Sequence, residues 1–322
     1  MATYKEIKGD VVETVASDPT NPGEGDIWYN TTTGVLKGYT FTAAAWAAGG
    51  NLNTARRAMG TAGTQTAALT FGGANPAVTN SEEYNGTSWT EGNDIGTARN
   101  ALAGAGTQTA GLGFGGEVTG VGATGATEEY DGTSWSEQND LSTVRAAIGG
   151  AGTQTAGLAF GGAPNLNATE EYDGTSWTAG GALGTARDAV AVGGAGTQTA
   201  GLAIGGRINP PFTVVGATEE YSGTAWTAGG TMGTARYNFG GGGTQIAAIG
   251  FGGYRPGNTA VTELYDGSTW TTSTSLATAR RQIVGCGTQP LALAMGGYAA
   301  GDTALTEEFT NSFNAVETIT TS

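Results

Sequence analysis

The chain has 322 residues, of which 59 are Gly, and its 13 basic and 28 acidic residues give a formal net charge of −15. The acidic excess argues against a nucleic-acid partner, and the absence of His removes the commonest general base and metal ligand. No stretch approaches the roughly 20 apolar residues of a membrane helix. So much Gly, with seven Trp, eleven Tyr and nine Phe, favours short strands and tight turns over disorder. The lone Cys286 has apolar neighbours and is expected to be a small buried residue.

The first 39 residues form a region of their own. Residues 17–22 contain two Pro and predict a turn-rich linker. Residues 26–30 and 35–39, joined by a Thr-rich turn, predict a hairpin. We therefore expect an N-terminal region with a hairpin up to residue 39 and a repeat domain over residues 40–322. For residues 1 to about 22, a docking arm and a plain flexible terminus both stay open.

From residue 46 onward the sequence repeats. A Trp recurs six times, and an Arg follows each Trp after ten residues. The period of 42 to 49 residues is typical of the blades of a β-propeller, each of which is a four-stranded sheet. The pairs are Trp46 and Arg56, Trp89 and Arg99, Trp135 and Arg145, Trp177 and Arg187, Trp226 and Arg236, and Trp270 and Arg280.

Each repeat predicts four strands, A to D, in a constant order. In the third repeat, strand A follows Arg145, and strand B is the apolar run 156–160 that ends in two glycines. Strand C carries Glu-Glu-Tyr at residues 170–172, and strand D begins at Trp177. Asp-Gly at residues 173–174 predicts a tight turn between C and D.

The last repeat is incomplete and the first has an extra piece. Phe309 replaces Tyr in the last copy and no Trp follows it, whereas Trp46 precedes the first Arg without strands A to C of its own. We therefore expect the segment around Trp46 to supply the last strand D. Such an interlock removes open sheet edges.

An apolar strand that ends in a double glycine, followed by a Tyr and then a Trp, resembles the kelch repeat. The resemblance covers residues 46 to about 310. It implies an all-β fold, a six-bladed kelch-like β-propeller with four antiparallel strands per blade, closed by an N-terminal strand. The double glycines are Gly72-Gly73, Gly115-Gly116, Gly161-Gly162, Gly205-Gly206, Gly252-Gly253 and Gly296-Gly297.

The six repeated arginines are expected near one mouth of the propeller channel, and two interpretations stay open. They form an anion site, or each pairs with backbone carbonyls or with a strand-C carboxylate such as Glu129 or Glu171. A repeated Gln is expected to satisfy backbone groups in the turn between strands A and B. It occurs at Gln65, Gln108, Gln154, Gln198, Gln245 and Gln289.

The repeats differ most in the loops between strands B and C. In a kelch-like blade these loops share a face with the D-to-A connections, so they form one variable surface around the arginine mouth. Their residue types suit carbohydrate or protein contacts, and ordinary solvated loops are the alternative. The candidate ligand-binding residues are Arg207, Asn209, Phe212, Tyr254, Arg255, Asn258, Tyr298 and Asp302.

Residues 23–39, together with near-identical blades rich in Gly, Thr and Ala, are similar to segments of bacteriophage tail-fibre and other virion proteins. This resemblance implies a non-enzymatic virion structural or adhesin protein: a tail fibre, tip or decoration module. It would dock on other virion proteins through its N-terminal arm and present its loops to a host-surface glycan or protein. We expect it in the virion after assembly in the host cytoplasm, because residues 1–10 lack the apolar core of a signal peptide.

Two other functions stay open. A cytoplasmic kelch-type adaptor would bind an acidic peptide at the arginine mouth. A carbohydrate-active enzyme would need two carboxylates at a mouth, for which Glu117 and Asp302 are isolated candidates. We expect no catalytic residue, no metal site and no cofactor. A weak Ca²⁺ site in an acidic loop and a homo-oligomeric state are left open.

Overall fold

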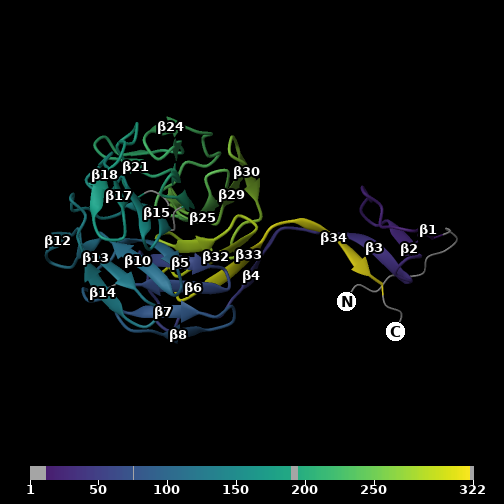
Figure 1. Cartoon of the computed structure of the whole chain (residues 1–322). Helices are drawn as coiled ribbons and strands as arrows, with labels where there is room; N and C mark the ends of the chain where they lie inside the picture. The colour runs from purple at the N-terminus through teal and green to yellow at the C-terminus, as the bar shows by residue number, and fades with distance from the viewer. Residues whose placement is uncertain (1–11, 75, 190–194, 320–322) are drawn as a thin grey trace. The chain divides into compact units, whose positions relative to one another are not determined.

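The computed structural model describes residues 12–74, 76–189 and 195–319. All 34 secondary-structure elements assigned in these residues are β-strands, so the predicted all-β class is confirmed. The chain divides into two compact units, which are described separately (Figure 1). Unit 1 comprises Met1–Ala44 and Asn311–Ser322, and unit 2 comprises Ala45–Thr310. Residues 40–44 and 311–322 thus fall outside the unit that contains the repeats, unlike the predicted boundary at residue 39.

Unit 2 consists of repeated four-stranded antiparallel sheets, a propeller-like arrangement. Six such sheets occur in its described residues, and we number them repeats 1 to 6 along the chain. The strands are β5 (Gly60–Thr64), β6 (Ala67–Phe71), β7 (Ser81–Tyr84) and β8 (Trp89–Glu91); β9 (Ala103–Thr107), β10 (Ala110–Phe114), β13 (Thr127–Tyr130) and β14 (Trp135–Gln138); β15 (Gly149–Thr153), β16 (Ala156–Phe160), β17 (Thr169–Tyr172) and β18 (Trp177–Ala179); β19 (Ala195–Thr197), β20 (Ala200–Ile204), β23 (Thr218–Tyr221) and β24 (Trp226–Ala228); β25 (Gly240–Thr244), β26 (Ala247–Phe251), β29 (Thr262–Tyr265) and β30 (Trp270–Ser273); and β31 (Val284–Gly287), β32 (Leu291–Met295), β33 (Thr306–Thr310) and β4 (Ala45–Ala48).

Short two-stranded pieces extend three of the loops between strands B and C. They are β11 (Glu117–Val118) with β12 (Gly122–Ala123), β21 (Arg207–Ile208) with β22 (Thr213–Val214), and β27 (Tyr254–Arg255) with β28 (Gly257–Asn258).

Small residues in the first strands allow the sheets to approach one another. A Cβ atom added at Gly104 would lie 2.4 Å from the Thr61 carbonyl oxygen and 2.9 Å from the Phe71 ring of the preceding repeat. The second strands, by contrast, carry large apolar residues such as Leu69 and Phe71, which are fully buried because sheets cover both of their faces. The core of unit 2 therefore lies between neighbouring sheets.

A closed ring of backbone hydrogen bonds links the six repeats. The residue two positions after each repeated Arg has a left-handed backbone conformation, with φ between 50° and 53°. Each of these residues donates its N–H to its counterpart in the preceding repeat, and Ala58 of repeat 1 donates to Gln282 of repeat 6 at 2.9 Å. A left-handed non-glycine residue costs about 1–2 kcal/mol, so the surrounding packing must enforce it. The six are Ala58, Ala101, Ala147, Ala189, Asn238 and Gln282.

Each repeat also donates side-chain hydrogen bonds to the repeat before it. The Trp177 indole donates to the Thr127 hydroxyl at 3.0 Å, and the other repeated Trp residues make the same type of bond. Gln154 donates to the carbonyls of Gly111 and Tyr130 at 3.2 and 2.7 Å. The prediction that this Gln serves its own turn is wrong, because its amide reaches the backbone of the neighbouring sheet.

The segment around Trp46 completes repeat 6. β4 pairs antiparallel with β33, and Trp46 lies opposite Phe309. The Trp46 indole donates to the Thr262 hydroxyl of repeat 5 at 3.0 Å, and its ring centre lies 5.0 Å from that of Phe251. An N-terminal strand therefore closes the last sheet, and it is held there by non-covalent contacts.

Tyr–Glu hydrogen bonds join the repeats at five interfaces in the described residues. The Tyr of strand C donates its hydroxyl to the second Glu of the preceding repeat, as Tyr172 does to Glu129 at 3.0 Å. Burial and the neighbouring carboxylate raise the pKa of Tyr84 to about 12, which keeps this donor protonated. Between repeats 5 and 6 both partners differ, since Leu264 stands at the Glu position and Phe309 at the Tyr position. Apolar residues thus occupy both positions of the polar pair at that interface.

Unit 1 is a four-stranded sheet of its own. It contains β1 (Glu13–Val15), β2 (Ile27–Asn30), β3 (Val35–Thr42) and β34 (Phe313–Thr318). β2 and β3 form the predicted hairpin, β1 lies parallel to β2, and β34 lies antiparallel to β3. The chain segments before and after the repeats are therefore strands of one sheet.

Asp18 fastens the connection between β1 and β2 onto the hairpin. It accepts hydrogen bonds from Lys37, Asn30 and Trp28 at 2.7, 2.7 and 3.1 Å, which lower its pKa to about 2. Residues 13–15 of the predicted docking arm therefore form a strand of this sheet, and the docking role of the arm stays a prediction. Residues 1–11 lie outside the described residues.

Trp46→Ala is expected to destabilise unit 2 by about 3–5 kcal/mol, and more than the matched variant Trp135→Ala. The Trp135 indole makes an equivalent bond, to Ser81 at 3.1 Å. Its strand, however, is joined to strand C of its own sheet by the chain, whereas β4 is not. Chemical unfolding measures both losses. A loss below about 1 kcal/mol for Trp46→Ala would contradict the closing role.

Tyr130→Phe is expected to cost about 1–3 kcal/mol, because Glu83 loses the hydroxyl that donates to it. Adding Glu83→Leu copies the natural pair of Leu264 and Phe309 and is expected to recover most of that loss. A double-mutant cycle measured by chemical unfolding gives the coupling, expected at about 0.5–3 kcal/mol. Additive losses would show that the two kinds of pair are not interchangeable.

Candidate functional site

The six repeated arginines are buried ion pairs. Each is at most 1% exposed and binds the first Glu of strand C in its own repeat, with N–O distances of 2.7–3.0 Å. The predicted partners Glu129 and Glu171 are wrong, because side chains alternate along a strand and the second Glu faces the next repeat. The pairs are Arg56–Glu82, Arg99–Glu128, Arg145–Glu170, Arg187–Glu219, Arg236–Glu263 and Arg280–Glu307.

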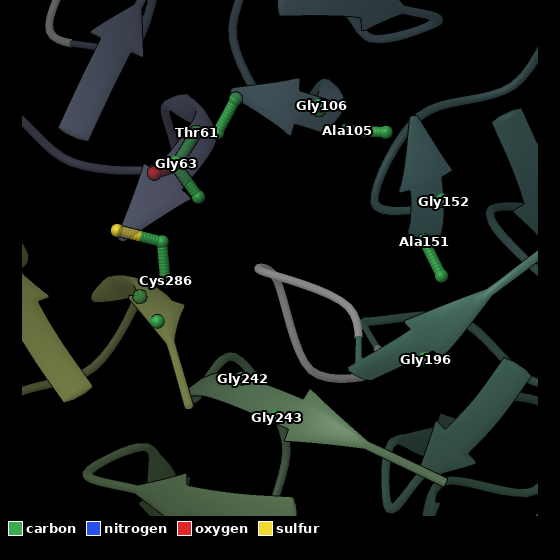
Figure 2. A pocket seen from close by; sticks show the side chains of 14 residues that line it. Thr61, Gly63, Ala105, Gly106, Ala151, Gly152, Gly196, Gly242, Gly243 and Cys286 are labelled. Atoms are coloured by element: carbon green, nitrogen blue, oxygen red, sulfur yellow. The ribbon is translucent and has the colours of Figure 1, made fainter. Parts of the chain in front are cut away.

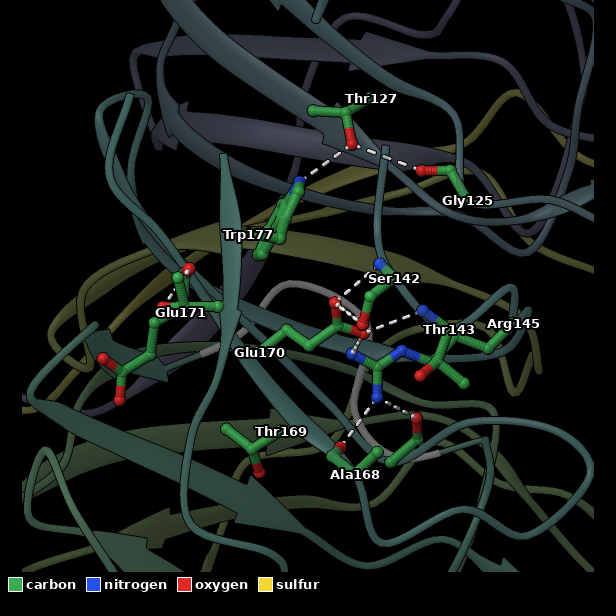
Figure 3. A network of polar contacts seen from close by, with 12 residues as sticks. Gly125, Thr127, Ser142, Thr143, Arg145, Ala168, Thr169, Glu170, Glu171 and Trp177 are labelled. Carbon is green, nitrogen blue, oxygen red and sulfur yellow. Dashed lines mark hydrogen bonds and ion pairs between the residues drawn. The ribbon is translucent and has the colours of Figure 1, made fainter. Parts of the chain in front are cut away.

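Figure 3 shows one of these pairs in its surroundings. Arg145 donates to Glu170 at 3.0 Å and to the carbonyls of Gly161 and Ala168 at 3.2 and 2.7 Å. Glu170 also accepts the backbone N–H and the hydroxyl of Ser142, both at 2.7 Å. The ion pair thus fastens the connection that enters the repeat to the end of its sheet, and the arginines do not form an open anion site.

A cavity of about 150 Å³ lies where the first strands of the repeats meet (Figure 2). Its described lining is Gly and Ala apart from Thr61 and Cys286. Cys286 is 6% exposed, and burial raises its pKa to about 12, so its thiol stays protonated. The prediction of a small buried residue is confirmed. The described lining brings no acid and base together.

Six of the seven isolated β-bridges in the described residues follow one pattern, at the end of the sheets where strands B end. Each of the six joins the residue after a repeated Arg to the residue after a double glycine. The residues just before the bridged positions, the repeated Arg and the second glycine, do not change between repeats, whereas the bridged positions vary. We call the surface that the bridged positions and the adjoining B-to-C loops form the loop face. A rigid frame that carries variable side chains is the usual build of a binding surface. The bridges are Arg57–Ala74, Asn100–Glu117, Ala146–Ala163, Asp188–Arg207, Tyr237–Tyr254 and Arg281–Tyr298.

In repeats 4, 5, 6 and 1 the loop-face side chains form a continuous row of aromatic rings and arginines. Tyr237 packs edge-on against Phe212 and Tyr254, with ring centres 5.9 and 5.5 Å apart. The Arg281 guanidinium lies 5.0 Å from the ring centre of Tyr254 and 4.6 Å from that of Tyr298. Arg57 lies 5.1 Å from the Tyr298 ring. We call Phe212, Tyr237, Tyr254, Arg281, Tyr298 and Arg57 the aromatic–arginine row.

Six of the eight predicted ligand-binding residues belong to this row or contact it. Beyond the three that are members, Arg207 lies 5.3 Å from the Tyr237 ring and Asp302 pairs with Arg57. Asn258 donates to the Tyr298 carbonyl at 2.9 Å. The other two, Asn209 and Arg255, are exposed and take no part in the contacts that build the row.

Four residues of the loop face were not predicted from the sequence, although their variation between repeats could have identified them. Arg57, Asp188, Tyr237 and Arg281 each follow a repeated Arg directly. The residue at that position is Arg, Asn, Ala, Asp, Tyr or Arg in the six repeats, while the Arg before it never changes. Variation beside an unchanging residue marked the position as part of the loop face.

The two isolated carboxylates suggested for catalysis have separate surroundings. Asp302 pairs with Arg57, and Glu117 is exposed on β11, where its backbone pairs with Asn100. The structure shows no contact between the two acids. Across residues 12–74, 76–189 and 195–319, no group of three Cys, Asp or Glu side chains is placed to hold a metal ion.

No protein-family model matches the chain, and a search of curated proteins finds no match. The resemblances to kelch repeats and to virion proteins therefore stay predictions. The part of the chain that the structure describes contains no helix long and apolar enough to span a bilayer.

Arg145→Met is expected to destabilise unit 2 by about 3–5 kcal/mol, because it leaves the Glu170 carboxylate buried without its cation. Arg145→Met/Glu170→Met removes both charges and is expected to recover part of the loss, because the Ser142 N–H and the Gly161 and Ala168 carbonyls still lose their partners. The control Arg57→Met removes an arginine whose side chain is 20% exposed, against at most 1% for Arg145, and is expected to cost less, about 1 kcal/mol. Chemical unfolding tests all three variants. Equal losses for Arg145→Met and Arg57→Met would contradict the structural role of the buried pairs.

Proposed function

We propose that unit 2 is a closed six-bladed kelch-like β-propeller and that the protein is a non-enzymatic structural and adhesin component of a virion, as a tail fibre, tip or decoration module. In this proposal the loop face binds a host-surface molecule and unit 1 attaches the protein to other virion proteins. The aromatic–arginine row is the observation that carries the binding role.

Six sheets and their mutual bonds support the propeller. The ring of left-handed residues returns from repeat 6 to repeat 1 through Ala58 and Gln282. The indole bond of Trp46 to Thr262 places β4 in the same register as the other fourth strands. Closure of six sheets accounts for both observations.

The division between constant and variable side chains supports a binding role without chemistry. The repeated Arg, Gln, Tyr and Trp side chains bond within the protein, so the variable positions of the loop face are the ones left for a partner. Asp302 pairs with Arg57, and the central cavity pairs no acid with a base in its described lining. Nothing in these arrangements favours the enzyme alternative.

The composition of unit 1 supports its role in attachment. Tyr29, Phe41, Phe313 and Val316 are 39–48% exposed on a sheet of four strands. Within the described residues β34 has β3 as its one partner strand, so its other edge offers backbone groups for strand addition. Exposed apolar side chains beside an open edge are typical of an assembly surface. Residues 23–39 of this unit also carry the resemblance to virion proteins.

The alternative function, an adaptor that binds an acidic peptide, loses the binding site on which that hypothesis was based. It relied on the repeated arginines as an open cationic mouth, and each of those arginines is buried against a Glu.

Imaging virions from the source material by cryo-EM tests the virion proposal. We expect a six-bladed disc on the particle with the loop face outward, and peptides of this chain in the purified particles by mass spectrometry. Particles that lack both the disc and the peptides would overturn the virion role.

A second experiment tests the loop face itself. Labelled Tyr237→Ala/Tyr254→Ala protein is expected to lose at least about tenfold in affinity for host cells, equal to about 1.4 kcal/mol, because two rings of the row are removed. The matched control is Ile246→Ala/Leu291→Ala. It removes two exposed apolar side chains near the turns between strands A and B, at the other end of the sheets. Equal binding by the two variants would move the site away from the loop face.

A further inference from the structure

The positive charges of unit 2 that are not buried are concentrated on the loop face. Between residues 45 and 310 the chain has ten Arg, no Lys and 21 acidic residues. Six of the ten arginines are the buried ones. The other four, Arg57, Arg207, Arg255 and Arg281, all lie in or beside the row, in an otherwise acidic unit. This concentration of charge favours an anionic ligand.

Arg281 is the cation of the row that is both oriented and available. Arg57 and Arg207 pair with Asp302 and Asp188. Arg281 has no carboxylate partner among the described residues; it contacts two Tyr rings and donates to the Asn258 side chain at 3.4 Å. The rings fix its direction while leaving its charge unneutralised. A fixed guanidinium of this kind suits a planar carboxylate, which it can bind with two parallel hydrogen bonds.

We propose that the aromatic–arginine row binds an acidic carbohydrate, a glycan whose sugar units carry carboxylates. Arg281 pairs with a sugar carboxylate, and the neighbouring rings of Tyr254 and Tyr298 pack against the C–H faces of the sugars. This inference rests on the proposed binding role of the loop face and names the class of ligand for it.

The shape of the row favours a glycan over an acidic peptide. Side-chain anchors of a bound peptide need pockets, and the row lines neither the cavity of about 150 Å³ nor the one of about 280 Å³. The row instead presents half-buried Tyr rings, rigid and amphipathic, beside a cation. Rings that are fixed in this way can stack on a sugar without a pocket.

Binding of defined oligosaccharides to the full chain, measured by calorimetry at low salt, tests the inference. The probes are oligogalacturonate, oligomers of alginate, hyaluronan and polysialic acid, and oligogalacturonate whose carboxylates have been reduced to alcohols. We expect at least one acidic oligosaccharide to bind. Where oligogalacturonate binds, its reduced form is expected to bind at least about tenfold more weakly, because an alcohol cannot form the charge-assisted hydrogen bonds that a carboxylate forms with Arg281.

Two arginine variants with the same change of charge provide the matched comparison. Arg281→Gln is expected to lose at least about tenfold in affinity for the acidic probe, and Arg255→Gln less than about threefold, because Arg255 is exposed and no ring holds it. Arg281→Lys keeps the charge without the planar fork and is expected to fall between wild type and Arg281→Gln. Unchanged melting temperatures show that these effects arise in binding.

The outcomes separate this inference from the function on which it rests. Equal binding of the acidic and reduced oligosaccharides would overturn the acidic class while leaving glycan binding in place. Equal losses for Arg281→Gln and Arg255→Gln would show non-specific attraction and overturn the assigned site. If no acidic glycan binds, the inference fails. In that case, loss of cell binding by Tyr237→Ala/Tyr254→Ala would still support the loop face, and binding of a polyglutamate peptide would indicate a protein ligand.

Discussion

Closure of the ring is the constraint on which the rest of unit 2 depends. Six left-handed residues pass one backbone hydrogen bond from repeat to repeat until Gln282 accepts the amide of Ala58. A ring leaves no repeat free to move away from its neighbours, so the spacing of the first strands is fixed. That spacing requires glycine at contacts such as Gly104, where a Cβ would meet the backbone of Thr61. Part of the high Gly content is thus a consequence of this close spacing, and other glycines, such as Gly132 and Gly174, have positive φ in turns.

The paired acids of strand C show how one dipeptide serves two interfaces. Because side chains alternate along a strand, Glu170 faces Arg145 of its own repeat while Glu171 accepts the Tyr221 hydroxyl of the next. The first contact fixes the incoming connection to the sheet, and the second fixes sheet to sheet. Where the second acid is replaced by Leu264, the next repeat has Phe309 and no hydroxyl to satisfy. Both partners have changed together at this interface. The two side chains must therefore match each other: both polar and hydrogen-bonded, or both apolar.

Features with local or periodic signals could be predicted, and those that depend on distant pairing could not. The repeat of Trp and Arg predicted the sheets, and the unpaired Trp46 predicted the strand that closes repeat 6. The hairpin over residues 26–39 was visible from its turn. The amide of Gln154 was assigned to its own turn because turn chemistry is local, whereas its bonds cross to another sheet. The pairing of β34 with β3 joins segments about 275 residues apart, as from Thr40 to Ala315, and neither strand carries a local sign of it.

On the loop face, too, features with a local signal could be predicted from the sequence, and features that depend on distant pairing could not. The loops were recognised by their variation. Tyr237 and Arg281, however, lie next to unchanging arginines, and they join the surface through β-bridges that no local sequence pattern predicts. The resulting surface is asymmetric on a frame that is nearly symmetric. Repeats 4, 5, 6 and 1 carry rings and cations, while repeat 3 carries Ala146 and Ala163 at the same positions. In the proposed propeller, six identical repeats would offer a ligand six equivalent orientations, and the single row removes that equivalence. The frame supplies rigidity through bonds between repeats, so side chains of the row can change without breaking any bond that closes the ring.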